Sequence, residues 1–327
     1  MCVPVRQLFL FFIAIIGTSA SLAPTIDLND GNKILVVALG TGRGTAKQNE
    51  TLDDVHNAVY WAIEAGYRHI DTAAVYKDEE QVGRGIADAI AKGLVTREEL
   101  FITTKLWSDK HATEQVVPEL RRSLQRLGLD YVDLYLIHFP IAIKADGTAD
   151  DIDYLDTWKG MEEARRLGLT KSIGVSNFNS EQLDRLIANS DNKPAVNQIE
   201  VNPTLTQEGL VSHCQKLGVA VMAYSPFGFL VARKTPSQVR IDETKLEAIA
   251  LKYKKNTSQI ILRYLLDRGL IVIPKSTNKE RIAQNIDLFD FRLTADEVAA
   301  VSEYNTNTRV IDASHYKNFP YYPFEKN

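Results

Sequence analysis

The sequence has very little cysteine and no block of like charges. Its cysteines are Cys2 and Cys214, so loss of the N-terminus would leave one thiol, too few for an internal disulfide or a thiolate metal site. The histidines show no metal-ligand spacing, and no Gly-x-Ser-x-Gly elbow occurs. The formal net charge of −4 argues against a nucleic-acid surface. We therefore expect no metal and no nucleic-acid partner.

Internal repeats, low-complexity tracts and long linkers are also missing. Hydrophobic residues make up 45% of the chain and charged residues 24%, the balance of a soluble protein with a large core. The 327 residues suit two ordinary domains or one large α/β barrel, which typically has about 250 residues. Because no linker divides the chain, we expect one domain, residues 21–327. We also expect the protein to be a monomer.

The N-terminus departs from this composition. Arg6 precedes an apolar run over residues 8–16, and small residues follow at 17–20. A positive region, an apolar core of about 7–15 residues and a small-residue cleavage site describe a secretory signal peptide. A membrane span would need about 20 apolar residues, so we expect no membrane anchor. We predict a signal peptide over residues 1–20, cleaved after Ala20; the alternative is a buried first helix or strand.

A signal peptide predicts that the mature protein is secreted, and the alternative compartment is the cytoplasm. The triplets that begin at Asn49 and Asn256 fit the N-glycosylation pattern, which also arises often by chance. A domain of this size needs no disulfide for its stability, so the single mature cysteine is compatible with either compartment.

Short apolar runs alternate with segments of helical periodicity after a small hairpin over residues 25–35. The runs, each long enough for a buried parallel strand, begin near Val36, Tyr67, Phe101, Val132, Ser172, Ala195, Val219 and Leu270. The helical segments are Leu52–Ala65, Gln81–Lys92, Glu114–Leu127, Leu155–Leu167, Glu181–Ile187 and Glu208–Leu217. The last interval has room for an excursion over residues 227–242 and additional helix, and a closing helix, Ala295–Ser302, precedes an aromatic tail. This rhythm predicts an α/β fold, a (β/α)₈ TIM barrel.

Seven consecutive strands are followed by a polar or ionisable residue. In chain order these residues are Asp71, Lys105, His138, Ser176 with Asn177, Gln198, Tyr224 and Lys275. The carboxyl ends of the strands of such a barrel face one mouth, where active sites are assembled. Taken singly, each residue could be structural, for instance a buried salt bridge or a core histidine. Their convergence predicts an enzyme.

Four of these groups together suit the reduction of a carbonyl. Tyr76 lies five residues after Asp71 and can donate a proton, although the unperturbed pKa of a tyrosine is about 10. We expect the Lys105 ammonium to lower this pKa, with Asp71 holding the lysine charged. His138 can hydrogen-bond the same substrate oxygen. Such a site lacks only a hydride source.

The remaining strand-end residues suit a nicotinamide cofactor. Tyr224 offers a flat face to the ring, and the amide and hydroxyl groups of Ser176, Asn177 and Gln198 suit its carboxamide. Residues 273–278 predict a strand-to-helix turn, which is a phosphate site. Lys275 and Arg281 would bind a 2′-phosphate, so NADPH is favoured over NADH. The alternative is that both cations decorate a solvated helix start.

From Thr25 onward the sequence resembles the aldo-keto reductase family. The motifs that carry the resemblance are Gly66-Tyr-Arg-His-Ile-Asp-Thr-Ala73 with Tyr76, Leu136-Ile-His-Phe-Pro140, Gly174-Val-Ser-Asn-Phe178, and Ile273-Pro-Lys-Ser276 with Arg281, Gln284 and Asn285. The resemblance implies a catalytic tetrad of Asp71, Tyr76, Lys105 and His138, with Tyr76 as general acid. It also implies NADP(H) contacts from Gly40, Thr41, Ser176, Asn177, Gln198, Tyr224, Ser225, Phe227, Lys275, Ser276, Thr277, Arg281, Gln284 and Asn285.

The sequence departs from the family pattern at three positions. Gln284 stands where many relatives carry Glu, and Gly42 and Phe139 stand where many aldehyde-reducing relatives carry Trp. With the signal peptide, this combination is similar to secreted insect reductases that act on 3-dehydroecdysteroids in haemolymph. We therefore expect a steroid ketone bound by Trp107, Phe139, the excursion over residues 227–242 and the aromatic tail over residues 319–324. The alternatives are a broad-specificity aldehyde reductase and aromatics that only pack the tail.

Two other classes of protein fit parts of the sequence. Gly40-Thr-Gly-Arg-Gly44 imitates the phosphate loop of a doubly wound dehydrogenase, with Asp71 as ribose ligand, but the spacing is not Gly-x-Gly-x-x-Gly. Some barrels of the resembled family serve as lens proteins or channel partners instead. An intact tetrad argues against lost catalysis, and a signal peptide argues against a cytosolic channel partner.

Overall fold

Eight short parallel strands form the centre of the molecule. The computed structural model describes residues 23–42, 51–231, 241–311 and 313–324 of the chain. In sheet order the strands are β3 (Leu39–Gly40), β4 (His69–Asp71), β5 (Phe101–Leu106), β6 (Val132–Ile137), β9 (Thr170–Ser176), β10 (Val196–Glu200), β11 (Ala220–Tyr224) and β12 (Ile271–Val272). The two ends of the sheet meet where Val37 pairs with Val272 and the Ala38 amide donates to the Val272 carbonyl at 2.9 Å. The sheet is thus closed, and the predicted barrel is confirmed.

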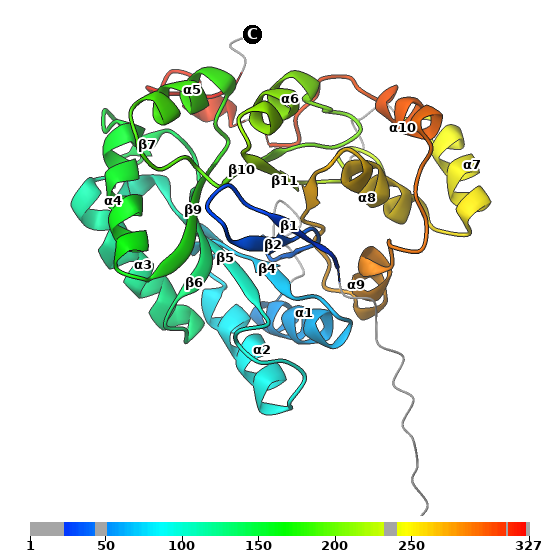
Figure 1. Cartoon of the computed structure of the whole chain (residues 1–327), viewed down its shortest axis with the longest axis horizontal. Helices are drawn as coiled ribbons and strands as arrows, with labels where there is room; N and C mark the ends of the chain where they lie inside the picture. Colours follow the sequence, from blue (N-terminus) through cyan, green and yellow to red (C-terminus); the bar gives the residue numbers. More distant parts are fainter. Residues whose placement is uncertain (1–22, 43–50, 232–240, 312, 325–327) are drawn as a thin grey trace, which may run out of the picture.

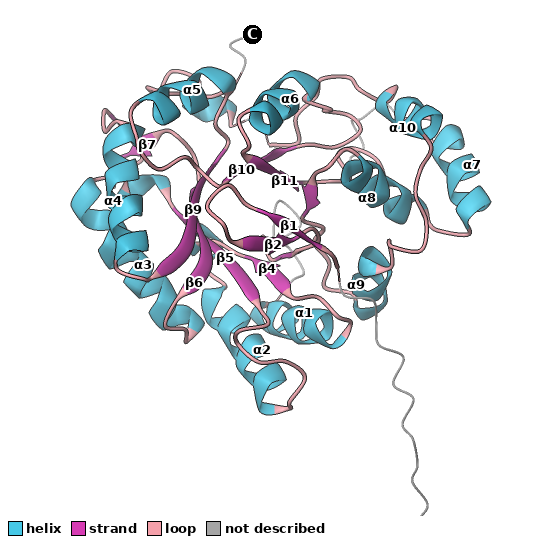
Figure 2. Ribbon diagram, in the orientation of Figure 1, coloured by secondary structure: helices cyan, strands magenta, loops and turns pink. Residues whose placement is uncertain are grey.

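Helices surround the barrel (Figure 1, Figure 2). They are α1 (Leu52–Glu64), α2 (Glu79–Ala91), α3 (Thr113–Leu127), α4 (Tyr154–Arg166), α5 (Ser180–Ala188), α6 (Glu208–Lys216), α7 (Thr244–Tyr253), α8 (Thr257–Asp267), α9 (Lys279–Ile286) and α10 (Ala295–Ser302). Each predicted helix is present, and each predicted strand begins within three residues of its expected start. The long last interval holds α7 and α8. A further hairpin, β7 (Ala142–Ile143) with β8 (Ala149–Asp150), was not expected.

Local signals explain where several helices begin. In four of them the side chain before the first helical residue accepts the third amide, and the third side chain accepts the amide of the capping residue. These reciprocal pairs are Thr51/Asp54, Asn179/Gln182, Asn256/Gln259 and Thr294/Glu297. Loss of such a cap typically costs a helix about 1 kcal/mol. The caps therefore fix the residue at which each of α1, α5, α8 and α10 begins.

The two ends of the barrel are closed differently. The predicted N-terminal hairpin, β1 (Thr25–Asp27) with β2 (Lys33–Leu35), covers the end where the strands begin, and Ile34 packs there among the inward side chains. Figure 1 looks onto this hairpin, which lies across the barrel. At the opposite end, Phe139 and Ala313 form an apolar cluster with aromatic residues of the C-terminal tail. This leaves the carboxyl ends of the strands as the end where a site can open.

Some predictions fall outside the residues that the structure describes. These are the signal peptide over residues 1–20, the triplet at Asn49 and most of the excursion over residues 227–242. Asn256 is described: its exposed side chain caps α8 and donates to Gln284 at 3.2 Å, and its glycosylation stays a prediction. Within the described ranges, no helix is both long and apolar enough to span a membrane.

Candidate active site

A buried ion pair lies at the carboxyl end of β4 and β5. Lys105 Nζ donates to Asp71 Oδ1 at 2.6 Å and to the Thr72 carbonyl at 2.8 Å, and the Lys105 side chain is fully buried. The second oxygen of Asp71 accepts from Gln198 Nε2 at 2.7 Å. The carboxylate is therefore satisfied on both oxygens, as a buried charge requires. Three of the residues predicted to meet at the mouth do so.

Tyr76 lies beside this ion pair on a single turn of 3₁₀ helix, η1 (Ala74–Tyr76). Lys105 Nζ is 5.2 Å from the centre of its ring, and the His138 ring meets it edge-on with the centres 5.7 Å apart. The next residue, Lys77, has a φ of 56°, which turns the chain sharply toward the start of α2. The four residues of the predicted tetrad thus come together.

The pKa of Tyr76 differs from the expectation. Burial, followed by the Asp71 and Asp78 carboxylates, raises the pKa of the phenol well above its ordinary value of 10.0. The expected lowering of this pKa by Lys105 is wrong for the free protein, because the lysine charge is offset by Asp71, to which it is bonded at 2.6 Å. Tyr76 therefore remains a neutral phenol with a proton to donate over the physiological pH range.

His138, which follows β6, is held as a neutral imidazole. Burial, and after it the Lys105 charge, keep the pKa of this histidine well below its ordinary value of 6.5. Its ring lies between Trp107 and Phe139, with centres at 5.1 Å and 6.0 Å. Among the described residues its Nδ1 is buried without a hydrogen-bond partner. A neutral histidine can hydrogen-bond a substrate oxygen, but it is not a charged acid competing with Tyr76.

The residues predicted to hold a nicotinamide form one hydrogen-bonded chain. The Tyr224 hydroxyl donates to Asn177 Oδ1 at 2.8 Å, and Asn177 Nδ2 donates to the His138 carbonyl at 2.9 Å and to Ser176 Oγ at 3.1 Å. Ser176 Oγ in turn donates to the Gln198 carbonyl at 2.8 Å. Asn177 has a φ of 62°, a conformation that asparagine tolerates well. This chain fixes the Tyr224 ring, whereas the Gln198 amide is already bonded to Asp71.

The predicted phosphate end lies across β3 and β12. The Gly40 amide donates to the Pro274 carbonyl at 3.0 Å, which brings Gly40 and Thr41 beside the turn that carries Lys275, Ser276 and Thr277. Ser276 Oγ accepts from the Asn278 amide at 3.1 Å, and Asn278 caps α9 by accepting from the Arg281 amide at 2.9 Å. The Arg281 side chain is exposed on the first turn of α9, and Asn285 is buried on the same helix. Hydroxyls and a cation at a helix N-terminus suit a phosphate group.

Two more predicted cofactor residues follow β11. Ser225 has a φ of 47°, and its carbonyl accepts from the Gly228 amide at 3.0 Å. The Phe227 carbonyl accepts from the Leu230 amide at 3.0 Å, so the chain turns tightly here before leaving the described residues. The turn places both residues next to Tyr224, on the rim of the mouth.

The predicted substrate residues also meet. The rings of Trp107 and Phe139 lie edge to face with centres 6.3 Å apart, and Phe324 of the tail contacts Phe139 at 6.0 Å. Phe139 is only 7% exposed, because the tail covers it. Gly42 stands directly on the Tyr76 ring, where an added Cβ would lie 3.1 Å from Cζ. The aromatic wall is present, and its role toward a substrate stays a prediction.

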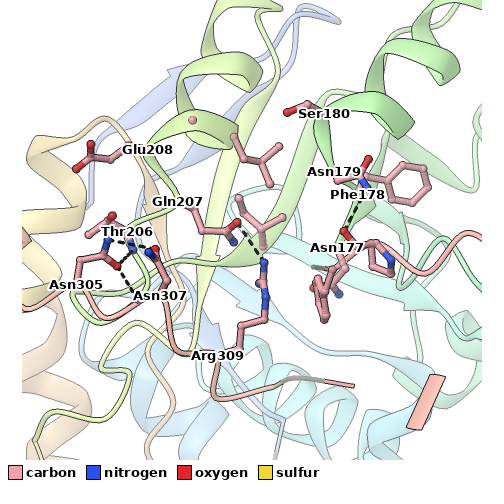
Figure 3. Close-up of a pocket in the computed structure, with 15 residues that line it drawn as sticks. Asn177, Phe178, Asn179, Ser180, Thr206, Gln207, Glu208, Asn305, Asn307 and Arg309 are labelled. Atoms are coloured by element: carbon pink, nitrogen blue, oxygen red, sulfur yellow. Dashed lines mark hydrogen bonds between the residues drawn. The ribbon is translucent and has the colours of Figure 1, made fainter. Parts of the chain in front are cut away.

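A cavity of about 430 Å³ lies beside this network, between α5, α6 and the C-terminal segment (Figure 3). Asn177 and Phe324 line it on the side of the site, and Gln207 and Arg309 line it on the other. The four tetrad residues do not line it. This cavity therefore lies next to the tetrad and is not the space into which the tetrad side chains point.

Sequence reasoning missed three residues that support the site. Thr72 offers its carbonyl to Lys105, and its hydroxyl donates to the buried Asp78 carboxylate at 3.0 Å. Glu200 is fully buried at the end of β10. The alternation of side chains along a strand places Glu200 on the same face as Gln198, and that spacing could have found it. Within the described residues no group of acidic, histidine or cysteine side chains could hold a metal ion.

Comparisons with known proteins agree with this geometry. Residues 36–306 match the model of the Aldo/keto reductase family. The chain is 68% identical to aldo-keto reductase AKR2E4 of Bombyx mori over 92% of this chain and 98% of that protein, and 41% identical to human aldo-keto reductase family 1 member C2 over 91% and 97%. A crystal structure of AKR2E4 in complex with NADP superposes with a TM-score of 0.91, covering 93% of this chain and all of that one. A structure of AKR2E5 complexed with NADPH, 43% identical, superposes at 0.89 over 93% and 94%.

Proposed function

This chain belongs to the aldo/keto reductase family, a family of NADP-dependent oxidoreductases, and on that premise we propose that it reduces a ketone or aldehyde to an alcohol with NADPH and with Tyr76 as general acid. The observation that carries the assignment of the acid is the arrangement of a neutral phenol beside the buried Asp71–Lys105 pair and a neutral His138. The bound nucleotide supplies a hydride to the carbonyl carbon.

The residues of the chain supply the proton and hold the reacting oxygen. The Tyr76 hydroxyl donates its proton to the carbonyl oxygen, so that hydride and proton together convert the carbonyl into an alcohol. The buried Asp71–Lys105 pair, whose ammonium lies 5.2 Å from the centre of the Tyr76 ring, holds this phenol in position. Neutral His138 donates a hydrogen bond to the same oxygen and so favours the charge that develops there.

The donor set also fits the two ends of NADP(H). Ser176, Asn177 and Tyr224, already fixed by their mutual hydrogen bonds, would hold the nicotinamide. Arg281 and Ser276 at the start of α9, with Lys275, would hold the 2′-phosphate. The bound NADP and NADPH of the two silkworm structures support this cofactor.

We infer that the substrate is a bulky steroid ketone, most specifically a 3-dehydroecdysteroid. The support is the apolar wall formed by Trp107, Phe139 and Phe324 next to His138, because aromatic side chains of about 150–250 Å² each suit a rigid apolar skeleton. Gly42 has no indole to add to this wall, and its backbone packs against the Tyr76 ring, 3.1 Å from Cζ at the position of an added Cβ. A broad-specificity aldehyde reductase is the second candidate, since the tetrad itself selects no particular carbonyl.

Competitive turnover separates these substrates. The purified protein is given 3-dehydroecdysone and a short aldehyde at equal NADPH, and both alcohols are quantified. We expect the larger kcat/KM for the steroid. If the aldehyde is preferred tenfold or more, the steroid is abandoned and the general aldehyde reductase is kept. No oxidation of NADPH with any carbonyl would reject the enzymatic function.

We also propose that the protein is secreted as a monomer after cleavage behind Ala20. Ala23 is buried and β1 begins at Thr25, so a mature chain that starts at Ser21 keeps every helix and strand that the structure describes. N-terminal sequencing of protein from a eukaryotic secretion host tests this proposal. Recovery of intracellular material with an intact Met1 would contradict it.

A further inference from the structure

The side chain of Glu200 connects the barrel to the C-terminal segment. It is the last residue of β10 and is fully buried, in register with Tyr224 on β11. Its Oε1 accepts from the Val310 amide at 2.7 Å, and its Oε2 accepts from the Ile311 amide at 2.9 Å. One carboxylate thus binds two consecutive amides that lie 110 and 111 residues further along the chain.

The amides bound by Glu200 stand just before the part of the tail that covers the mouth. Ala313, two residues after Ile311, is buried in the cluster that contains Phe139. The tail is fastened again near its end, where Gln182 on α5 donates to the Tyr321 carbonyl at 2.8 Å and Asn179 donates to the Pro323 carbonyl at 3.2 Å. The aromatic part of the tail is therefore a strap held at two ends, and Glu200 holds the first.

Weaker contacts surround the same end. The Thr204 carbonyl accepts from the Thr306 and Thr308 amides, each at 3.2 Å. Arg309 donates to Gln207 at 3.5 Å, and Figure 3 shows Arg309 reaching up to Gln207 beside the cavity. These hydrogen bonds are longer than the two that the Glu200 carboxylate accepts from Val310 and Ile311.

The bonds to Glu200 are the strong ones at this end, because hydrogen bonds to a buried carboxylate are about twice as strong as neutral ones. Burial raises the pKa of Glu200, and the Val310 and Ile311 amides oppose that rise by stabilising the charged form. The two amides stabilise the charged form of Glu200, and the charge strengthens its hydrogen bonds to them. Removal of the charge should therefore loosen the chain at Val310 and Ile311.

We propose that Glu200 is a positioning residue for substrate recognition: it fixes the start of the strap so that the tail aromatics stand against Phe139 at the mouth. It acts through the Val310 and Ile311 amides and makes no contact with the reacting carbonyl. The part of this inference that concerns substrate rests on the proposed function, whereas the part that concerns the strap does not.

The test compares Glu200→Gln with Glu208→Gln. Both substitutions remove one negative charge, but Glu208 is exposed at the start of α6. Hydrogen bonds to a charged group are worth about 1.5–3 kcal/mol, so we expect amide exchange at Val310 and Ile311 to accelerate about 10- to 150-fold in Glu200→Gln alone. Hydrogen exchange measures the protection of these two amides directly and does not depend on which substrate the protein reduces.

Kinetics then test the consequence for recognition. In Glu200→Gln we expect KM for a bulky aromatic ketone to rise at least fivefold with kcat retained, while KM for a short aldehyde and the Kd for NADPH stay within twofold. Glu200→Asp, which keeps the charge, should restore most of the exchange protection. Unchanged exchange at both amides in a folded Glu200→Gln protein would overturn the anchor.

Three further outcomes are informative. Accelerated exchange with an unchanged KM for every ketone would overturn the role in recognition while leaving the anchor. If Glu200→Gln does not fold, the wild-type protein decides: exchange at Val310 and Ile311 at the rate of a fully unprotected amide would overturn the proposal, and slower exchange would support it. Absence of turnover in the wild-type protein, with the Val310 and Ile311 amides protected from exchange, would count against the proposed function instead.

Discussion

Lys105 and Asp71 are bonded at 2.6 Å between neighbouring strands, and the side chain of neither is more than 4% exposed. A charge at this depth is tolerated only with a partner, because the desolvation penalty is several kcal/mol for each ion. Thr72 and Gln198 complete the hydrogen bonds of the pair. Removal of only one partner is therefore strongly destabilising. The intact pair is a rigid support next to the Tyr76 ring.

Replacement of Lys105 by Met should lower the free energy of unfolding by about 3–5 kcal/mol, because it leaves the buried Asp71 carboxylate unpaired. The double variant Lys105→Met with Asp71→Asn should recover much of that loss. Urea denaturation measures both. Lys159→Met, which breaks an exposed pair with Asp156, is the control and should cost less than about 1 kcal/mol. A double variant as unstable as the single one would contradict the ion-pair argument.

Tyr76→Phe should keep NADPH binding and lose kcat by about 10²–10⁴, the usual contribution of a positioned general acid. The substitution removes the hydroxyl while the ring keeps its edge contact with His138. Single-turnover kinetics and cofactor fluorescence titration measure the two quantities. Near-normal kcat in this variant would refute the assignment, and loss of cofactor binding would show that the hydroxyl has another role.

His111 should make the protein sensitive to acid. Burial lowers its pKa from 6.5 to about 3, and among the described residues neither ring nitrogen has a hydrogen-bond partner. Between these two pH values the unfolded chain binds a proton that the folded chain does not. Stability is therefore full above pH 6.5 and falls as the pH is lowered, by about 1.4 kcal/mol per pH unit for this one group.

His111→Leu should remove that part of the slope without loss of stability at pH 7. The measurement is urea denaturation of the variant and the wild type at pH 7, 6 and 5. His213→Leu is a control, because His213 is paired with Asp184 at the surface. Parallel slopes for His111→Leu and the wild type would mean that His111 is not buried in its neutral form.

Lys275→Ala and Arg281→Ala should weaken NADPH binding about 10- to 150-fold and leave NADH binding nearly unchanged. Each substitution would remove one charge-assisted hydrogen bond between the side chain and the 2′-phosphate, worth about 1.5–3 kcal/mol. Lys279→Ala is a matched control on the same helix, since Lys279 is paired with Glu64 instead. Equal weakening of both nucleotides would show that these residues do not read the 2′-phosphate.

The barrel and the residues at its mouth could be predicted because both follow from local patterns. Buried parallel strands are short apolar runs, and the residue after each run lies at the mouth whatever its partners are. Electrostatic details could not be predicted in this way. Lys105 was expected to lower the pKa of Tyr76, but the nearest charge to Lys105 is Asp71, and burial raises that pKa instead.

Contacts between distant parts of the chain were equally out of reach. The bonds from Glu200 to Val310 and Ile311 join strand β10 to the tail, and no periodicity links those positions. The sequence showed that the tail is aromatic, yet only the fold places Phe324 on Phe139. Such pairings depend on how the tail returns across the mouth, which is a tertiary property.

Phe139 offers the sharpest separation between a substrate wall and simple packing of the tail. Its ring contacts Trp107, His138 and Phe324, so it could serve either purpose. Phe139→Leu keeps an apolar side chain in the same place and removes only the aromatic contacts, each worth about 0.5–1.5 kcal/mol. Stability should therefore fall slightly under both interpretations, and only kinetics can distinguish them.

If the wall binds substrate, Phe139→Leu should lower kcat/KM for a steroid ketone about 2- to 12-fold, the equivalent of one aromatic contact, and change that for a short aldehyde less than twofold. We expect a short aldehyde to reach Tyr76 and His138 without touching the tail, so that its rate reports the tetrad alone. Phe289→Leu controls for the loss of a ring elsewhere, since Phe289 packs against a different apolar cluster from Phe139 and lines a cavity with Ile26 of the N-terminal hairpin. Equal losses for both substrates would mean that Phe139 only packs the tail and keeps His138 in place.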